Sequence, residues 1–240
     1  MAPGPLRPWP PGWSRPVSTW WPPTCAGITP SPGGDNSMKA LGQDVIAQVE
    51  ALGGSVHLIG HDYGAQMGYE ALNVSPHSFK TATFLAVCHP NIIAQNMKRH
   101  PLDAWKLRHV FYFSAGTLAE KRVPANNFAY IDTLWKRWSP QLELPEGYLD
   151  RVKAMYRDSW PSPVAQYRNM DLTPLTGKFT VPTLQILGAH DGTTSEHTAE
   201  GNADLFAGEY SEVTLDNGAH FTHLDAPDEV ADLIVNWLRR

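Results

Sequence analysis

Short apolar runs alternate with stretches of helical periodicity along most of the chain. Four runs have the length of a buried strand: 55–59, 82–88, 181–187 and 211–215. Apolar residues recur at helical spacing in 44–52, 66–72 and 227–238. Strands separated by helices predict a mostly parallel sheet flanked by helices, which is an α/β fold.

The regular succession of strand-like runs stops between residues 91 and 178. This segment is helical in pattern and rich in aromatic side chains, including Tyr112, Trp135, Trp138 and Tyr167. An aromatic, helical insertion between two strands of a sheet is typical of a lid over a substrate pocket. We therefore expect an α/β core formed by residues 35–90 and 179–240, with a helical lid at 91–178.

The first 34 residues break the composition of the rest of the chain. They hold ten of the 21 prolines and contain no Asp, Glu or Lys. Reading residues 19–27 one base earlier permits the string Asp-Val-Val-Ala-Pro-Asp-Leu-Arg-Gly, a buried strand followed by a turn. We hypothesise that the 1–34 segment is translated out of frame, which leaves the first strands of the sheet missing or scrambled. A proline-rich disordered arm is the alternative.

Composition argues against several kinds of partner. The 19 basic and 24 acidic residues give a net charge of -5, and no basic run could follow a nucleic-acid backbone. The two cysteines form neither a disulfide framework nor a CxxC pair, which indicates a reducing compartment. No stretch resembles a signal peptide or the roughly 20 apolar residues of a membrane span. We expect a soluble, cytoplasmic monomer or homodimer.

The first candidate for chemistry directly follows the 55–59 run. Gly60-His61-Asp62-Tyr63-Gly64 stands between a predicted strand and a predicted helix, in the small-x-nucleophile-x-small pattern of a nucleophile elbow. Glycines at both ends are expected to avoid collisions in this sharp turn. Asp62 takes the position of the nucleophile, and the backbone N–H of Tyr63 can serve an oxyanion hole. An ordinary turn with a capping Asp is the simpler alternative.

Two later turns carry further candidate catalytic residues, each after a predicted strand. Gly188-Ala189-His190-Asp191-Gly192 follows one predicted strand, and a turn at 217–227 that carries His220 follows the last. With these three motifs the chain resembles the α/β-hydrolase superfamily, in its epoxide hydrolase and haloalkane dehalogenase branch, from about Gly34 to its end. The resemblance implies the α/β-hydrolase fold with an inserted lid, and a triad of Asp62, Asp191 and His220.

The resemblance also implies a two-step hydrolysis that needs no cofactor. Asp62 would attack a substrate carbon and form an ester, and His220, oriented by Asp191, would activate the water that cleaves this ester. Tyr167 matches one of the two lid tyrosines that protonate the epoxide oxygen in epoxide hydrolases. The equivalent of the other tyrosine falls on His109, with Tyr112 close by.

A small hydrophobic epoxide and water are therefore the expected reactants. Trp135 is a candidate substrate contact, with plain packing as its alternative. A dehalogenase on the same triad is the second interpretation, although Tyr63 replaces the residue that follows the nucleophile in such enzymes. The third is an inactive or damaged relative, because the His-Gly-x-Pro loop that completes the oxyanion hole in the family cannot be read here.

Three further histidines lie near these motifs. His61, His89 and His223 are expected to be structural. None of them has the HExxH or CxxC spacing of a zinc site, so no metal is expected.

Overall fold

The computed structural model describes residues 37–169 and 174–240. Its strands form one sheet in the order β1-β2-β3-β4, and every neighbouring pair is parallel. The predicted α/β class and parallel sheet are confirmed. The hypotheses of an out-of-frame segment and of missing first strands concern residues 1–36, which lie outside the described residues. The strands are β1 (Val56–His61), β2 (Phe79–Leu85), β3 (Thr183–Gly188) and β4 (Tyr210–Leu215).

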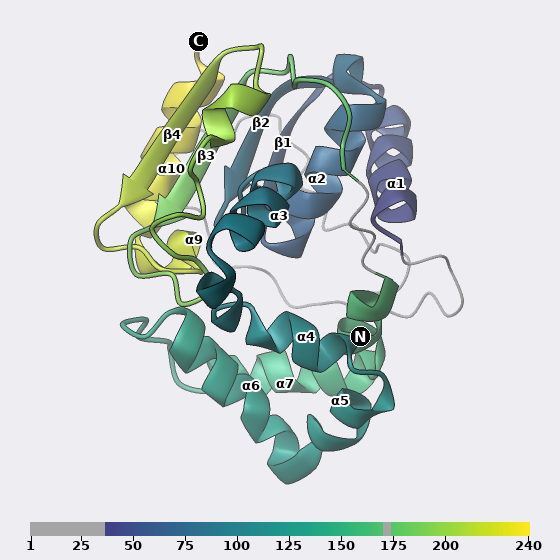
Figure 1. Cartoon of the computed structure of the whole chain (residues 1–240), viewed down its shortest axis with the longest axis vertical. Coiled ribbons are helices and arrows are strands. Elements are labelled where there is room, and N and C mark those ends of the chain that lie inside the picture. Colours follow the sequence, from purple (N-terminus) through teal and green to yellow (C-terminus); the bar gives the residue numbers. More distant parts are fainter. Residues whose placement is uncertain (1–36, 170–173) are drawn as a thin grey trace.

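Helices lie on both faces of the sheet and beyond the carboxyl ends of its strands (Figure 1). The helices around the sheet are α1 (Met38–Ala51), α2 (Tyr63–Val74), α3 (Pro90–Arg99), α9 (Thr222–Asp225) and α10 (Pro227–Leu238). The helical layer comprises α4 (Arg108–Ser114), α5 (Thr117–Arg122), α6 (Ala125–Trp138), α7 (Tyr148–Ser159) and α8 (Ser162–Ala165). Short 3-10 turns are η1 (Pro76–Ser78), η2 (Pro101–Trp105), η3 (Gln166–Asn169) and η4 (Asn202–Leu205).

Local sequence sets the bounds of α1. The Ser37 Oγ accepts a hydrogen bond from the backbone N–H of Ala40 at 3.2 Å and caps the first turn. Gly53 and Gly54 follow the last turn with φ of 91° and 76°, which only glycine adopts readily. The sequence pattern predicted this end but placed the start at residue 44. Gly42 interrupts the apolar period there because α1 approaches α2 closely, and a Cβ at residue 42 would lie 2.6 Å from the Cβ of Glu70.

Apolar cores on the two faces of the sheet hold it between α2 and α10. On one face, the ring of Tyr69 packs 4.0 Å from the ring of Phe84. A Cβ at Gly68 would lie 2.5 Å from the same Phe84 ring, so glycine permits this close approach. On the other face, Trp237 and Ile186 are buried in one cluster between α10 and the strands. The sheet is therefore covered by apolar contacts on both faces.

The helical layer has an apolar core of its own. Phe113, Ile131 and Val164 are buried in it, together with Phe221, which belongs to the loop after β4. The layer therefore packs directly on the loop that carries His220. Helix α3 falls within the range expected to form the lid, but it packs on the sheet: Ile93 lies against the cluster that contains Phe84, and Asn96 donates from Nδ2 to the carbonyl of His197 at 2.7 Å.

Strand β1 forms one edge of the sheet within the described part of the chain. Its partner on one side is β2, and the side chain of Ile59 is 52% exposed. Exposed apolar residues on an edge strand favour association between molecules.

Across residues 37–169 and 174–240, no helix combines the length and the apolar character needed to cross a membrane.

Candidate active site

Asp62 lies at a strained bend between β1 and α2. Its backbone has φ of 50° and ψ of -117°, a conformation that is unfavourable for a side chain other than glycine. A Cβ at Gly60 would lie 2.7 Å from the Gly64 carbonyl oxygen and 2.9 Å from the Ala65 nitrogen, so this position requires glycine. At Gly64 the expected collision is wrong: outside its own helix, an added Cβ meets no described heavy atom within 4 Å.

His220 and Asp191 form a buried pair on neighbouring loops. The His220 Nδ1 lies 3.0 Å from the Asp191 Oδ2, and their side chains are 3% and 1% exposed. The other oxygen of Asp191 accepts hydrogen bonds from the backbone N–H and the hydroxyl of Thr193, each at 2.7 Å. Because the carboxylate is held on both oxygens, it fixes the orientation of the imidazole and places the His220 proton on Nδ1.

The surroundings of His220 raise its pKa above the usual histidine value. Burial acts most strongly and lowers the pKa, but the charge of Asp191, the hydrogen bond to it and the charge of Asp62 together outweigh burial. The imidazole is therefore a stronger base than an isolated histidine.

The opposite nitrogen of His220 faces the elbow. Its Nε2 lies 3.8 Å from the Asp62 Oδ1, and the Asp62 side chain is 39% exposed. This distance exceeds a direct hydrogen bond, and a water molecule can connect two such groups. The three residues named from the sequence thus come together: an accessible carboxylate, a basic imidazole beside it and a buried carboxylate behind the imidazole.

His61 ties the elbow to the histidine loop. Its Nε2 lies 2.8 Å from the carbonyl oxygen of His220, and burial followed by the nearby His220 lowers its pKa. A neutral His61 donates this hydrogen bond and holds the backbone of the loop. This contact agrees with the structural role expected for His61.

The end of α6 supports the same loop, which sequence reasoning missed. The Trp138 carbonyl accepts hydrogen bonds from the backbone N–H of Gly192 at 3.1 Å and of His220 at 3.3 Å. The Ser139 Oγ accepts from the Phe221 N–H at 3.0 Å and donates to the Asp225 Oδ2 at 3.2 Å. The helical layer therefore positions the loops of both the acid and the histidine.

Tyr167, one of the candidates named from the sequence, lies beside Tyr63 of the elbow, and His109 lies beside Tyr167. The Tyr167 ring centre is 5.7 Å from that of Tyr63 and 6.5 Å from that of His109. Burial and then the charge of Asp62 raise the pKa of Tyr167, so its phenol stays protonated. Burial lowers the pKa of His109 to about 4, and its buried Nδ1 has no hydrogen-bond partner among the described residues. Both side chains are neutral near pH 7.

Two other predicted residues lie among packing contacts instead. The ring of Tyr112 lies 5.3 Å from that of Tyr130, inside the helical layer. Trp135 stacks on Phe221 with ring centres 4.0 Å apart, so it covers the histidine loop. Tyr156 was not predicted as a site residue, because it belongs to no motif. Burial and then the charge of Asp62 raise the pKa of Tyr156 to about 12, so its phenol lies close enough to interact with the Asp62 carboxylate.

The start of α2 supplies one candidate oxyanion donor. Tyr63 is the first residue of the helix, where backbone N–H groups have no acceptor within the helix. The positive end of the helix dipole adds to this effect. The His-Gly-x-Pro loop expected to give a second donor cannot be read in the sequence.

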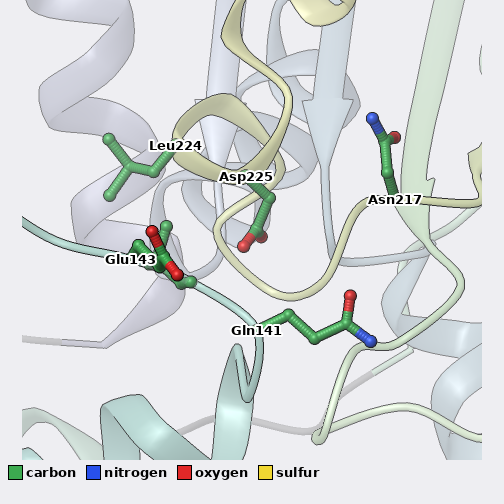
Figure 2. A pocket seen from close by; sticks show the side chains of 6 residues that line it. Gln141, Glu143, Asn217, Leu224 and Asp225 are labelled. Atoms are coloured by element: carbon green, nitrogen blue, oxygen red, sulfur yellow. The ribbon is translucent and has the colours of Figure 1, made fainter.

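A cavity of about 300 Å³ lies on another side of the histidine loop (Figure 2). Carboxylates and amides dominate its lining, which does not suit a hydrophobic substrate. None of the three predicted triad residues lines it. The lining residues are Gln141, Leu142, Glu143, Asn217, Leu224 and Asp225.

Comparison with known proteins shows the family of the chain. A sequence model of the alpha/beta hydrolase family matches residues 6–233. The chain is 26% identical over 192 residues to human Epoxide hydrolase 4, covering 76% of this chain and 53% of that protein. It is 23% identical to Epoxide hydrolase 3 of Xenopus tropicalis, covering 85% of this chain and 59% of that protein. The chain thus spans little more than half the length of these relatives.

Solved structures show the same fold. A variant of an epoxide hydrolase from Bacillus megaterium has a TM-score of 0.77 at 20% identity, covering 89% of this chain and 80% of that chain. A variant of the Vigna radiata epoxide hydrolase has a TM-score of 0.74 at 22% identity, covering 90% and 81%.

Proposed function

Because the chain belongs to the alpha/beta hydrolase family, we propose that it hydrolyses small hydrophobic epoxides through an ester formed on Asp62. The observation that carries the proposal is an aspartate, rather than a serine, at the strained elbow, with His220 Nε2 3.8 Å from its carboxylate. A carboxylate needs no deprotonation to attack a carbon atom. The names of the relatives support the choice of epoxides.

In the first step, an Asp62 oxygen attacks one epoxide carbon while the bond from that carbon to the epoxide oxygen breaks. Tyr167 donates a proton to the leaving oxygen, and His109 assists as a neutral hydrogen-bond donor. The product is a hydroxyalkyl ester on Asp62. The Tyr167 phenol carries its proton in the free enzyme and therefore has a proton to donate in this step.

In the second step, His220 takes a proton from water, whose oxygen attacks the carbonyl carbon of the ester. The Tyr63 N–H stabilises the resulting oxyanion. Collapse of this intermediate releases the diol and regenerates the Asp62 carboxylate, while the His220 proton returns to the phenolate of Tyr167. One water is added to the epoxide, and no cofactor takes part.

We propose that the helical layer is the lid over this site. Its residues Tyr167, His109 and Trp138 surround the elbow and the histidine loop, and the layer shares a core with Phe221. In the described part of the chain the buried Cys88 is a free cysteine, which supports our proposal of a cytoplasmic location.

A panel of substrates tests the function. The proposal expects diol formation from small aryl or alkyl epoxides, and neither halide release from haloalkanes nor rapid cleavage of activated esters. Halide release without diol formation would instead identify a dehalogenase on the same triad.

An inactive relative is the other candidate, since β1 lies at the edge of the described sheet with Ile59 half exposed. A folded chain with a cooperative melt but no turnover on any of these substrates would favour it.

Replacing Tyr167 with Phe should lower kcat/KM for epoxides by about 10²-fold to 10⁴-fold, because the leaving oxygen loses its acid. Tyr112→Phe is the matched control, since Tyr112 packs against Tyr130 within the helical layer and should leave the rate almost unchanged. Steady-state kinetics of diol formation measure both variants. Equal rates for Tyr167→Phe and the control would remove Tyr167 from the mechanism.

The rate of ester hydrolysis should fall at low pH with an apparent pKa above the usual histidine value, because protonated His220 cannot act as a base. Asp191→Asn removes the charge that raises this pKa and leaves the burial that lowers it. The acid limb should therefore move to lower pH, while the maximal rate falls by up to about 10⁴-fold as the imidazole loses its orientation. Single-turnover rates measured across pH test this shift, and an unmoved limb in Asp191→Asn would contradict it.

A further inference from the structure

Two histidines and a glutamate gather on the surface, outside the candidate active site. His100 directly follows the last residue of α3, whereas His197 and Glu200 lie in the loop between β3 and β4. Each offers one ligand atom, and these atoms all lie within 4.8 Å of one another. Imidazole nitrogen and carboxylate oxygen are the ligands that zinc and related ions prefer. The geometry points to a binding site for a divalent transition-metal ion such as Zn²⁺, formed by these three side chains.

A second carboxylate orients His197 for this task. The His197 Nδ1 lies 3.0 Å from the Asp103 Oδ2, and the Ser195 hydroxyl donates to the same oxygen at 2.7 Å. In neutral His197 the proton is therefore on Nδ1, and the lone pair is on Nε2, which lies 3.7 Å from the Oε1 of the exposed Glu196. Histidine ligands in metal sites commonly donate their other N–H to a carboxylate in this way.

The loop is also held in place before any ion binds. The buried Asn96 of α3 donates from Nδ2 to the carbonyl oxygens of His197 at 2.7 Å and Glu200 at 3.1 Å. The rings of His100 and His197 stack with centres 3.8 Å apart and an angle of 5° between planes. The His100 Nε2 lies 3.7 Å from the Glu200 Oε2.

Coordination requires the stacked rings of His100 and His197 to rotate, because the lone pair of each imidazole nitrogen lies in the plane of its own ring. Ligand atoms about 2.0–2.2 Å from one tetrahedral ion are about 3.3 Å apart. The side chain of Glu200 is 51% exposed and that of His100 is 33% exposed, so both have room to close on the ion. Water would fill the remaining position.

The site would join two parts of the chain that serve the active site. His100 stands where the chain leaves α3 for the helical layer, and His197 lies in the same loop as Asp191, between β3 and β4. An ion bound to both would stabilise the folded chain and restrain this junction. Spacing along the sequence could not reveal the site, because its histidines are 97 residues apart.

The test uses the full chain without an affinity tag, stripped of metal. Calorimetric titration with Zn²⁺ should show one saturable ion, and Co²⁺ should give the visible absorption bands of a site with nitrogen ligands. The melting temperature should rise by about 5–10 °C at a Zn²⁺ concentration of roughly a hundred times Kd. His197→Gln and His100→Gln should abolish these effects, while His77→Gln, which removes an exposed histidine elsewhere, should preserve them.

Asp103→Asn distinguishes an organised metal site from nonspecific metal binding by surface histidines. It leaves all three ligands in place but removes the partner of His197, so Kd should rise about 10-fold to 100-fold. An unchanged Kd in Asp103→Asn, or equal binding by His197→Gln and the original chain, would overturn the proposal.

Discussion

Asp62→Ala should reduce diol formation from epoxides by about 10⁴-fold or more, as expected when the nucleophile of a triad is lost. No other described carboxylate stands at the elbow to replace Asp62. Direct attack by water on the epoxide would be slow, because water is a weaker nucleophile than a carboxylate and is not positioned against the epoxide carbon. The fold should persist, because the Asp62 side chain is partly exposed and makes no capping hydrogen bond. Steady-state assays with product analysis give the rate, and thermal melts report the fold.

Asp204→Ala is the matched control for this experiment. Asp204 is an exposed aspartate in η4, away from the triad, so its removal should leave the rate unchanged. If Asp62→Ala keeps a rate within a few-fold of this control, Asp62 is not the nucleophile.

His220→Gln should separate the two halves of the reaction. Asp62 can still attack the epoxide, but no base activates the water, so ester hydrolysis should slow by about 10³-fold to 10⁴-fold. The ester should therefore accumulate to nearly one equivalent per chain. Mass spectrometry of digested protein should find the mass of the epoxide added to the peptide that contains Asp62.

The double variant Asp62→Ala/His220→Gln checks the site of attachment. It should carry no adduct on that peptide. An adduct of equal amount in the double variant would place the covalent bond elsewhere, and near-normal turnover by His220→Gln alone would remove His220 from the second step.

The sequence predicted the parts of the site that depend on local order along the chain. Asp62, Asp191 and His220 each follow a strand, and the carboxyl ends of parallel strands meet at one edge of the sheet. The three side chains therefore had to converge once the strands were recognised. The same logic located the carboxyl end of α1 and the start of α10, where glycine and proline act on the adjacent backbone.

Contacts that depend on how the helical layer packs could not be predicted. Ser139 binds the backbone of Phe221 across 82 residues, and no motif marks either end of this contact. The positions of Trp135, which stacks on Phe221, and of Tyr156 follow from the orientation of α6 and α7 rather than from a period in the sequence. Apolar periodicity shows that a helix is buried but leaves open which partner covers it.

The central claim is that Asp62 becomes covalently bonded to substrate, and oxygen isotopes test it most directly. A single turnover is run in ¹⁸O-water with enzyme in excess over epoxide. Our account predicts that the peptide containing Asp62 gains ¹⁸O, while the diol from this first turnover carries none, because its new oxygen comes from the carboxylate. A labelled diol with an unlabelled Asp62 would show direct attack by water and would contradict the mechanism.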